Sequence, residues 1–160
     1  QSIPYDQRKR TIAVFLGEVL YKARQEESPN PDMFAFLYNH IKMLDLKDQG
    51  LGNFHLYFLI HLAKYLGFSP RDNFNNSTPY FDLQNGQFTS LKPFHNHYIE
   101  TPHSSIFHQL LKNSAKQHQE IQIKKSDRLK LLHAILDFYY LHNQGMGHIK
   151  SLEILKDTLH

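Results

Sequence analysis

The sequence has no cysteine, no long apolar run and no large excess of charge of either sign among its 160 residues. The absence of cysteine excludes a disulfide scaffold, a zinc ribbon and a cysteine nucleophile, and it is typical of proteins in a reducing cytoplasm. No apolar run is long enough to span a membrane, and no signal segment opens the chain, so we expect no membrane partner. Eighteen Lys and Arg residues against fifteen Asp and Glu residues give a net charge of +3, which permits an anionic partner without requiring one.

What the sequence does contain is enough apolar material for one domain. Hydrophobic residues make up 41% of the chain and charged residues 21%, a balance typical of a globular protein with a real core. Twelve histidines make the charge sensitive to pH near neutrality. Because the first residue is Gln1 and not Met, we expect the chain to be a piece of a longer protein.

Helical periodicity covers most of the chain. Asp6 is placed to cap a first helix that reaches about Gln25, and Asn30 with Pro31 opens a second helix that reaches about Asp48. The second helix is expected to bury the apolar stripe formed by Phe34, Leu37, Tyr38, Ile41 and Leu44.

A third helix, over residues 53–66, is apolar on nearly every side, and Gly67 follows it as a C-cap. Such a helix is expected at the centre of the fold, surrounded by the others. Further helices are predicted over residues 104–115, over residues 126–143 with Ser126 as the cap, and from Ser151 through Leu159.

Residues 68–103 have a different composition, rich in Asn, Ser and Pro, which predicts a loop. Within them, residues 80–83 and 88–90 flank Asn85-Gly86, a pair that accepts the positive φ values of a two-residue type I′ turn. Two strands alone are marginal in water, so this hairpin should lean on the helices, while residues 91–101 are expected to be irregular. The predicted fold class is all-α, a single domain of about six helices with a small inserted β-hairpin around residues 80–90.

No catalytic motif is present. The sequence has no Gly-rich phosphate loop, no Gly-x-Ser-x-Gly elbow and no His-Glu-x-x-His pair. His133 and Asp137 lie one helical turn apart, but this spacing is equally that of a surface pair, and no nucleophile accompanies it. The acidic pairs at residues 26–27 and at Asp45 and Asp48 fall on solvated helix ends. The chain is therefore predicted to be a binding protein and not an enzyme.

A metal-dependent enzyme is the less favoured alternative. His95 and His97 lie on an extended segment, and His103 or His108 could complete a set of nitrogen ligands for zinc. The spacing is unspecific and the sequence places no carboxylate ligand beside it, so exposed loop histidines are the simpler interpretation.

Two groups of basic residues favour binding to an anion. Arg8, Lys9 and Arg10 lie at the start of the first helix, where cations oppose the helix dipole. If the second group shares a face with the first, the two can contact phosphates, and an apolar groove beside them can hold an acidic peptide with an apolar tip. The second group consists of Lys116, Lys124, Lys125, Arg128 and Lys130.

Aromatic residues offer a second means of holding a nucleic acid. Twelve Phe and nine Tyr are present, and such rings can stack on unpaired bases. Most of them fall on the core stripes of the predicted helices. The candidates for stacking are therefore the loop aromatics Phe74, Tyr80, Phe94 and Tyr98.

Three stretches of the sequence carry a family resemblance. Residues 11–23 read Thr-Ile-Ala-Val-Phe-Leu-Gly-Glu-Val-Leu-Tyr-Lys-Ala, and residues 53–70 end in Leu-Gly-Phe-Ser-Pro. Residues 138–142 read Phe-Tyr-Tyr-Leu-His, and residues 147–156 read Gly-His-Ile-Lys-Ser-Leu-Glu-Ile-Leu-Lys. In order and spacing these stretches resemble the first helix, the central helix with its exit turn, and the ending of the C-terminal region of RecO, a family of bacterial DNA repair and recombination mediators.

The resemblance implies a domain organisation and a set of partners. RecO proteins have an N-terminal OB-fold followed by a helical domain; they anneal complementary single strands and, with RecR, help to load RecA onto strands coated by single-strand binding protein. The helical domain is implicated in gripping the acidic tail of that binding protein. The resemblance thus implies that residues 1–160 are a RecO-like helical domain without the OB-fold, located in the bacterial cytoplasm with the nucleoid. The implied partners are single-stranded DNA, the C-terminal tail of single-strand binding protein, and RecR.

The chain departs from the family pattern at one place. Many RecO proteins insert a four-cysteine zinc module after the Leu-Gly-Phe-Ser-Pro turn, whereas this sequence has no cysteine there. We therefore expect residues 68–103 to replace that module, with no metal and no other cofactor. Two alternatives stay open: a structural module that positions the OB-fold and RecR, and the histidine-based metal enzyme. Charge placement, and not the family motif, selects the candidate binding residues Arg8, Lys9, Arg10, Lys124, Lys125 and Arg128.

Overall fold

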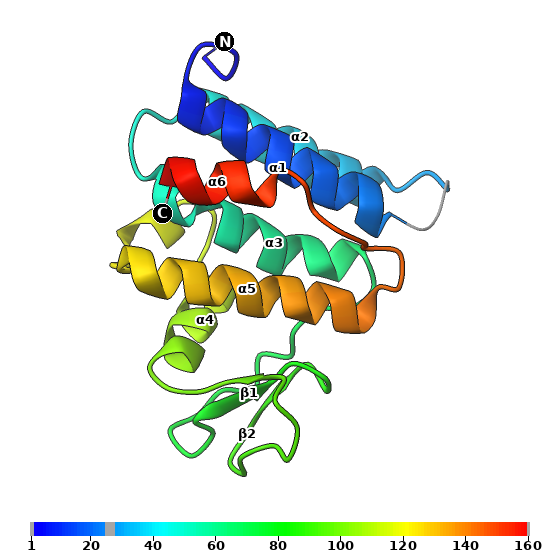
Figure 1. Ribbon diagram of the computed structural model, residues 1–160, viewed down its shortest axis with the longest axis vertical. Helices are drawn as coiled ribbons and strands as arrows, with labels where there is room; N and C mark the ends of the chain where they lie inside the picture. The colour runs from blue at the N-terminus through cyan, green and yellow to red at the C-terminus, as the bar shows by residue number, and fades with distance from the viewer. Residues whose placement is uncertain (1, 25–27, 160) are drawn as a thin grey trace.

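A computed structural model describes residues 2–24 and 28–159, and in this range helices form a body with a small sheet at one end (Figure 1). The prediction of a helical domain with a small β element is confirmed. The predicted end of the first helix at Gln25 and the acidic pair at residues 26–27 lie outside the described residues. The helices are α1 (Gln7–Ala23), α2 (Pro31–Leu46), α3 (Phe54–Tyr65), α4 (His103–Lys112), α5 (Lys125–His142) and α6 (Leu152–Leu159), with 3-10 turns η1 (Leu51–Asn53) and η2 (His118–Glu120) and strands β1 (Tyr80–Asp82), β2 (Gln87–Thr89) and β3 (Tyr98–Ile99). We call α1–α6 the helical body and residues 68–103 the insert.

Side-chain caps set the beginnings of the first two helices. The carboxylate of Asp6 accepts hydrogen bonds from the backbone N–H groups of Arg8 and Lys9, and the Asn30 side chain accepts one from Met33, which confirms both predicted caps. The predicted cap at Ser126 is wrong. The α5 helix begins one residue earlier, and its N-cap, Lys124, makes no side-chain cap.

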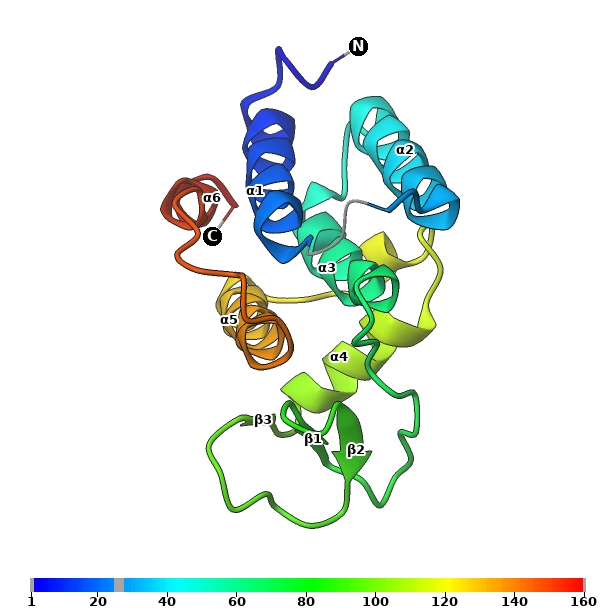
Figure 2. The same ribbon diagram turned by 90° about the vertical axis from the view of Figure 1, so that its right-hand side faces the viewer.

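The α3 helix lies at the centre of the helical body, as its sequence predicts (Figure 2). Nine of its twelve residues are buried, and it packs against α2, α4 and α5. The buried hydroxyl of Tyr139 on α5 donates a hydrogen bond of 2.6 Å to the carbonyl oxygen of Leu59 on α3. A helix that is apolar on every side is stable only where neighbours cover every side.

The α2 helix buries a different face from the predicted one. Phe34, Tyr38 and Ile41 are exposed, whereas Phe36 and His40 turn toward α3 together with Leu44. The prediction is wrong for these three residues because α2 has two apolar stripes, and the packing against α3 selects the one that contains Phe36. The stripe that contains Phe36 and His40 packs its rings against Phe54, Tyr57, Phe58 and Tyr65 of α3.

The insert folds into an antiparallel sheet with strand order β2-β1-β3. Asp82 pairs with Gln87, so four residues link β1 to β2, and Gly86 has a positive φ of 65°. No described residue other than glycine has a positive φ, so the predicted two-residue type I′ turn at Asn85-Gly86 is wrong. The loop is instead closed by the Asp82 carboxylate, which accepts hydrogen bonds from the N–H groups of Gln84 and Asn85. The strand β3 falls in the stretch predicted to be irregular.

Aromatic rings attach the sheet to the helical body. The ring of Phe81 on β1 is fully buried, with its centroid 4.5 Å from that of Phe107 on α4 and 6.1 Å from that of Phe138 on α5. Phe88 on β2 lies 4.8 Å from Phe81 by the same measure. The expectation that the hairpin leans on the helices is confirmed.

Candidate functional site

Lys9 belongs to the fold and not to the surface. Its side chain is 1% exposed, and its ammonium group donates hydrogen bonds to the Ser2 hydroxyl at 2.5 Å and to the Asp45 carbonyl oxygen at 2.8 Å. The segment before α1 is thereby tied to the end of α2. Because its donors are used inside the protein, Lys9 is removed from the predicted binding residues.

Arg8 and Arg10 are exposed on α1. The Arg8 guanidinium lies 3.5 Å from the Asp6 carboxylate, and Arg10 donates a hydrogen bond to the Pro4 carbonyl oxygen. An exposed ion pair of this kind is weak, so a phosphate can compete with Asp6 for Arg8. These two cations remain candidates for binding an anion.

The second predicted group lies at the start of α5. Lys124 and Lys125 are exposed and sit at the positive end of the helix dipole. Arg128 is held differently: a Cβ at Gly52 would overlap its guanidinium, and its Nε is buried without a hydrogen-bond partner among the described residues. Burial lowers the pKa of Arg128, which packs against η1. Lys116 and Lys130 are exposed as well, and the exposed cations at the start of α5 are the pair Lys124 and Lys125.

The two basic groups lie toward the same end of the helical body, since α1 and α5 begin on the same side in Figure 1. The α6 helix packs against α1 and separates the beginnings of the two helices. The groups therefore share an end of the molecule.

An apolar groove of about 800 Å³ lies at the other end of α5. Met33, Phe34 and Leu37 of α2 form one wall, and Arg24 and His142 stand in its lining together with the end of α3. The α5 helix has 18 residues and is roughly 27 Å long, so this groove is far from Lys124 and Lys125. This groove is therefore not beside these lysines, because the apolar face of α2 turns outward at the opposite end, and a groove beside the basic residues stays a prediction.

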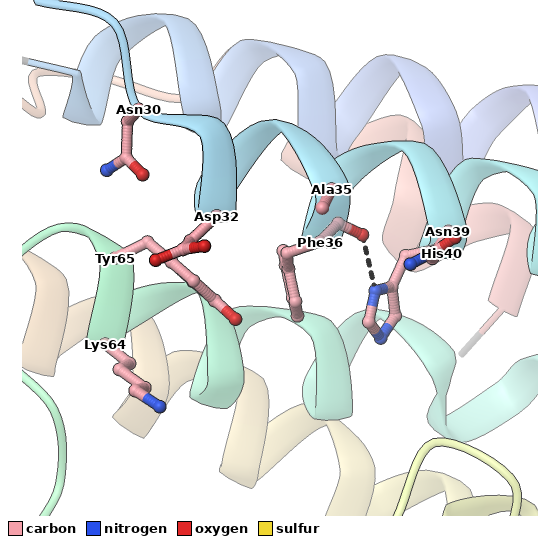
Figure 3. Close-up of a pocket in the computed structure, with 8 residues that line it drawn as sticks. All are labelled: Asn30, Asp32, Ala35, Phe36, Asn39, His40, Lys64 and Tyr65. Atoms are coloured by element: carbon pink, nitrogen blue, oxygen red, sulfur yellow. Dashed lines mark hydrogen bonds between the residues drawn. The ribbon is translucent and has the colours of Figure 1, made fainter.

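A second, more polar recess of about 580 Å³ lies between α2 and α3 (Figure 3). Asp32 on α2 lies opposite Lys64 and Tyr65 on α3, and Asn39 lines the recess beside His40. His40 lines the recess, and its Nδ1 lies 2.7 Å from the Phe36 carbonyl oxygen. No nucleophile is paired with a base among these residues, so the recess offers no catalytic arrangement.

Three imidazoles surround Tyr57 in the helical body. The ring centroids of His61, His118 and His40 lie 4.2, 4.6 and 5.9 Å from that of Tyr57. Burial lowers the pKa of all three histidines, and for His118 burial and the nearby Lys47 ammonium lower it to about 4. Neutral imidazoles in an aromatic cluster are packing groups at pH 7.

The histidines predicted as metal ligands each meet a different aspartate. His95 lies 3.2 Å from Asp82, and His97 lies 2.6 Å from Asp137. Within residues 2–24 and 28–159, no group of three or more His, Asp or Glu side chains is placed to hold a metal ion. Asp137 contacts His97 and not His133. The pair of His133 and Asp137, one helical turn apart, is therefore not a catalytic arrangement. The sequence gives no signal for these contacts, because they join residues up to 40 positions apart. The other two pairs are His103 with Asp127 and His108 with Asp72.

Comparison with known proteins gives a consistent result. The family model described as Recombination protein O C terminal matches residues 4–153. The DNA repair protein RecO of Bacteroides fragilis is 36% identical over 157 residues, covering 98% of this chain and 65% of that protein. The RecO proteins of Flavobacterium johnsoniae and Azobacteroides pseudotrichonymphae are 37% and 35% identical, covering 98% and 92% of this chain and 64% and 61% of their own lengths. No solved structure matches the chain significantly.

These matches and the helical fold define the class first: this is a helical domain similar to the C-terminal part of proteins named DNA repair protein RecO. The chain belongs to the recombination protein O C-terminal family, as the resemblance of its helices and its ending predicts. It spans less than two thirds of the length of the relatives named above. Across the described residues, no helix combines the length and apolar character that a membrane crossing requires.

Proposed function

We propose that this chain acts in DNA repair and recombination in the bacterial cytoplasm by binding and not by catalysis. Its ligands in this proposal are single-stranded DNA and the acidic tail of single-strand binding protein, and it works with RecR in strand annealing and RecA loading. Membership of the RecO family supports the repair role. The observation that carries the DNA part is the exposed lysine pair at the start of α5.

An anion is the ligand that suits this helix start. Lys124 and Lys125 oppose the helix dipole, and no side chain caps the first N–H groups of α5. A phosphate beside them would pair with both ammonium groups and accept hydrogen bonds from the free N–H groups at once. Arg8 and Arg10, at the same end of the helical body, extend the path of a strand beyond α5.

The groove at the far end of α5 is our candidate for the acidic tail. Met33, Phe34 and Leu37 offer an apolar wall for a terminal aromatic side chain, and Arg24 in the same lining is a cation that suits carboxylates. In this proposal the DNA and the tail bind at opposite ends of α5, so both ligands can be held together.

Salt-dependent titration tests the DNA part. The double variant Lys124→Glu, Lys125→Glu is compared with the wild type and with the matched control Lys42→Glu, Lys64→Glu, whose exposed lysines lie on α2 and α3. We expect the first double variant to weaken binding to an oligonucleotide of deoxythymidine and to lower the slope of log affinity against log salt by roughly one to two. Equal binding by both double variants contradicts a site at the start of α5.

A peptide titration tests the tail part. An acidic peptide that ends in Phe should bind the wild type at low salt and should bind Leu37→Glu at least tenfold more weakly, because a carboxylate in the groove wall repels it. Leu46→Glu, at an exposed α2 position outside the groove lining, serves as the control. No binding at low salt by a chain whose circular dichroism is helical would overturn the tail proposal.

A second candidate function is supported by the exposed apolar face of α1 and α2. Val14 and Tyr21 on α1 and Tyr38 and Ile41 on α2 are 52% to 83% exposed. Such side chains suit a protein partner. In this candidate the chain is a structural module that positions an OB-fold and RecR. Tyr21→Glu with Ile41→Glu should then abolish binding to RecR and leave DNA affinity unchanged, whereas unchanged RecR binding contradicts it.

A further inference from the structure

The loop that enters β3 carries the most exposed aromatic ring of the described residues. Phe94 reaches 109% of its reference exposure, and Leu91 reaches 78%. The ring of Phe94 therefore gains nothing from the protein's own core. Single apolar residues on a surface need no explanation, but two within four positions form a tip whose apolar surface is offered to a ligand.

The tip stands on a rigid base. On its C-terminal side, the His97 N–H donates to Nδ1 of His95, and Nε2 of His95 lies 3.2 Å from the Asp82 carboxylate. Nδ1 of His97 lies 2.6 Å from the Asp137 carboxylate on α5, and the His97 carbonyl oxygen accepts a hydrogen bond from Leu83. A tip held in this way loses little conformational entropy when it binds.

The charge around the ring favours an anionic ligand. Residues 91–97 read Leu-Lys-Pro-Phe-His-Asn-His and contain one cation, two imidazoles and no carboxylate. Lys92 is two residues before Phe94 in the sequence. Its ammonium group lies 5.5 Å from the centre of the Tyr98 ring. Of the acidic groups close by, Asp82 is buried among its hydrogen bonds and Asp137 meets His97, whereas the exposed Glu100 attracts the Lys92 ammonium and is the carboxylate with which a phosphate competes. Lysine is depleted at the cores of protein interfaces, which makes an apolar protein pocket the poorer match for this tip.

We propose that the Phe94 ring stacks on an unpaired base of a single-stranded nucleic acid while Lys92 contacts the adjoining phosphate. The proposal rests on the DNA binding put forward above and adds the insert to the binding surface. Duplex bases are already stacked on each other, so this contact selects single strands. A ring that stacks on bases is tolerant of sequence, because every base has a flat face.

The absence of tryptophan from the chain gives a direct probe. The variant Phe94→Trp carries one tryptophan at the tip, and its fluorescence should be quenched when an oligonucleotide of deoxythymidine binds. Tyr21→Trp, at an α1 position that is 83% exposed, is the matched control and should stay bright. An oligonucleotide of abasic sites has the same phosphates without the bases, so it should bind without quenching Phe94→Trp.

Affinity measurements complete the test. Phe94→Ala should weaken binding to the deoxythymidine oligonucleotide by about tenfold at every salt concentration, with an unchanged salt slope, and Phe94→Tyr should restore it. Because the Phe94 side chain is fully exposed, these variants should keep the helical circular dichroism of the wild type.

The outcomes separate this inference from the proposed function. Unchanged affinity in Phe94→Ala and an unquenched Phe94→Trp, with binding still weakened by Lys124→Glu and Lys125→Glu, overturn the stacking and leave DNA binding in place. No binding of any oligonucleotide by the wild type overturns both. Quenching of Phe94→Trp by RecR or by single-strand binding protein, without quenching by the oligonucleotide, assigns the tip to a protein partner and overturns the stacking.

Discussion

The helical body is organised around one buried helix, whereas the insert reaches that body through rings and imidazole–carboxylate pairs. In α3 nine residues are buried and other helices lie around it, with Lys64 exposed near its end. The insert has strands of only two or three residues, and its contact with α5 includes the pair of His97 with Asp137, whose side chains are 41% and 36% exposed. Apolar burial dominates the first region, whereas the second is held by a few buried rings together with partly exposed polar contacts.

The largest effect should come from the centre of the helical body. Leu59→Ala removes a fully buried side chain from the middle of α3 and leaves a cavity there. We expect a loss of about 3 kcal/mol in the free energy of unfolding, measured by urea denaturation followed by circular dichroism. Leu91→Ala, at an exposed position of the insert, should lose nothing measurable. A loss below about 1 kcal/mol in Leu59→Ala contradicts a core centred on α3.

An intermediate effect should come from the edge of the helical body, where Glu18 of α1 closes the start of α6. Its carboxylate accepts hydrogen bonds from the N–H groups of Lys150 and Ser151 and from the Ser151 hydroxyl, and it lies 3.1 Å from the Lys22 ammonium. Burial alone would raise the pKa of Glu18, but these hydrogen bonds outweigh it and lower the pKa from 4.5 to about 2. Glu18→Gln should therefore cost about 2 kcal/mol at pH 7.

The pH dependence of this contact has a definite sign. Because the folded pKa of Glu18 lies below the unfolded one, its stabilisation is complete above pH 4.5 and is lost as the pH falls from 4.5 toward 2. Denaturation of the wild type and of Glu18→Gln should therefore converge at low pH. Glu153→Gln, which breaks an exposed pair with Lys156, is the control and should change little. A constant difference between wild type and Glu18→Gln across this range would count against the assignment.

The smallest effect on global stability should come from the junction between the two regions. Asp137→Asn removes the charge that meets His97, and we expect a loss below about 1 kcal/mol because both side chains are partly exposed. Amide hydrogen exchange in β3 should nevertheless become faster, since the pair positions the loop before that strand. Asp127→Asn, which faces His103 on α4, should leave β3 exchange unchanged. Equal exchange in both variants would mean that the rings alone hold the insert.

The same contrast explains how far the sequence predicts the fold. Asp6 and Asn30 act as predicted because a cap is a contact within three residues, and α3 is central because its apolar character leaves no other place for it. The outward turn of Phe34 was not predictable, because α2 has two apolar stripes and only the packing against α3 chooses between them. Strand β3 has two residues and depends on a partner that lies sixteen or more positions earlier.

The residues of the candidate site also differ in how far the sequence predicts their placement. Lys124 and Lys125 are at the surface as charge placement alone suggests, whereas the burial of Lys9 depends on Asp45, 36 residues away. The Arg128 guanidinium packs against Gly52, a contact that cannot be predicted from the sequence. Residues that act through local geometry are predictable, and those whose partners are distant along the chain require the fold.

The closure of α6 by Glu18 also has a consequence for the order of events on the ribosome. The Glu18 carboxylate accepts a hydrogen bond from the N–H group of Lys150, and these two residues are 132 positions apart. At bacterial synthesis rates the first of them waits about 7 to 26 s for the second to be made. During that interval α1 exposes the side that α6 will cover, so this apolar surface stays open until α6 has been made.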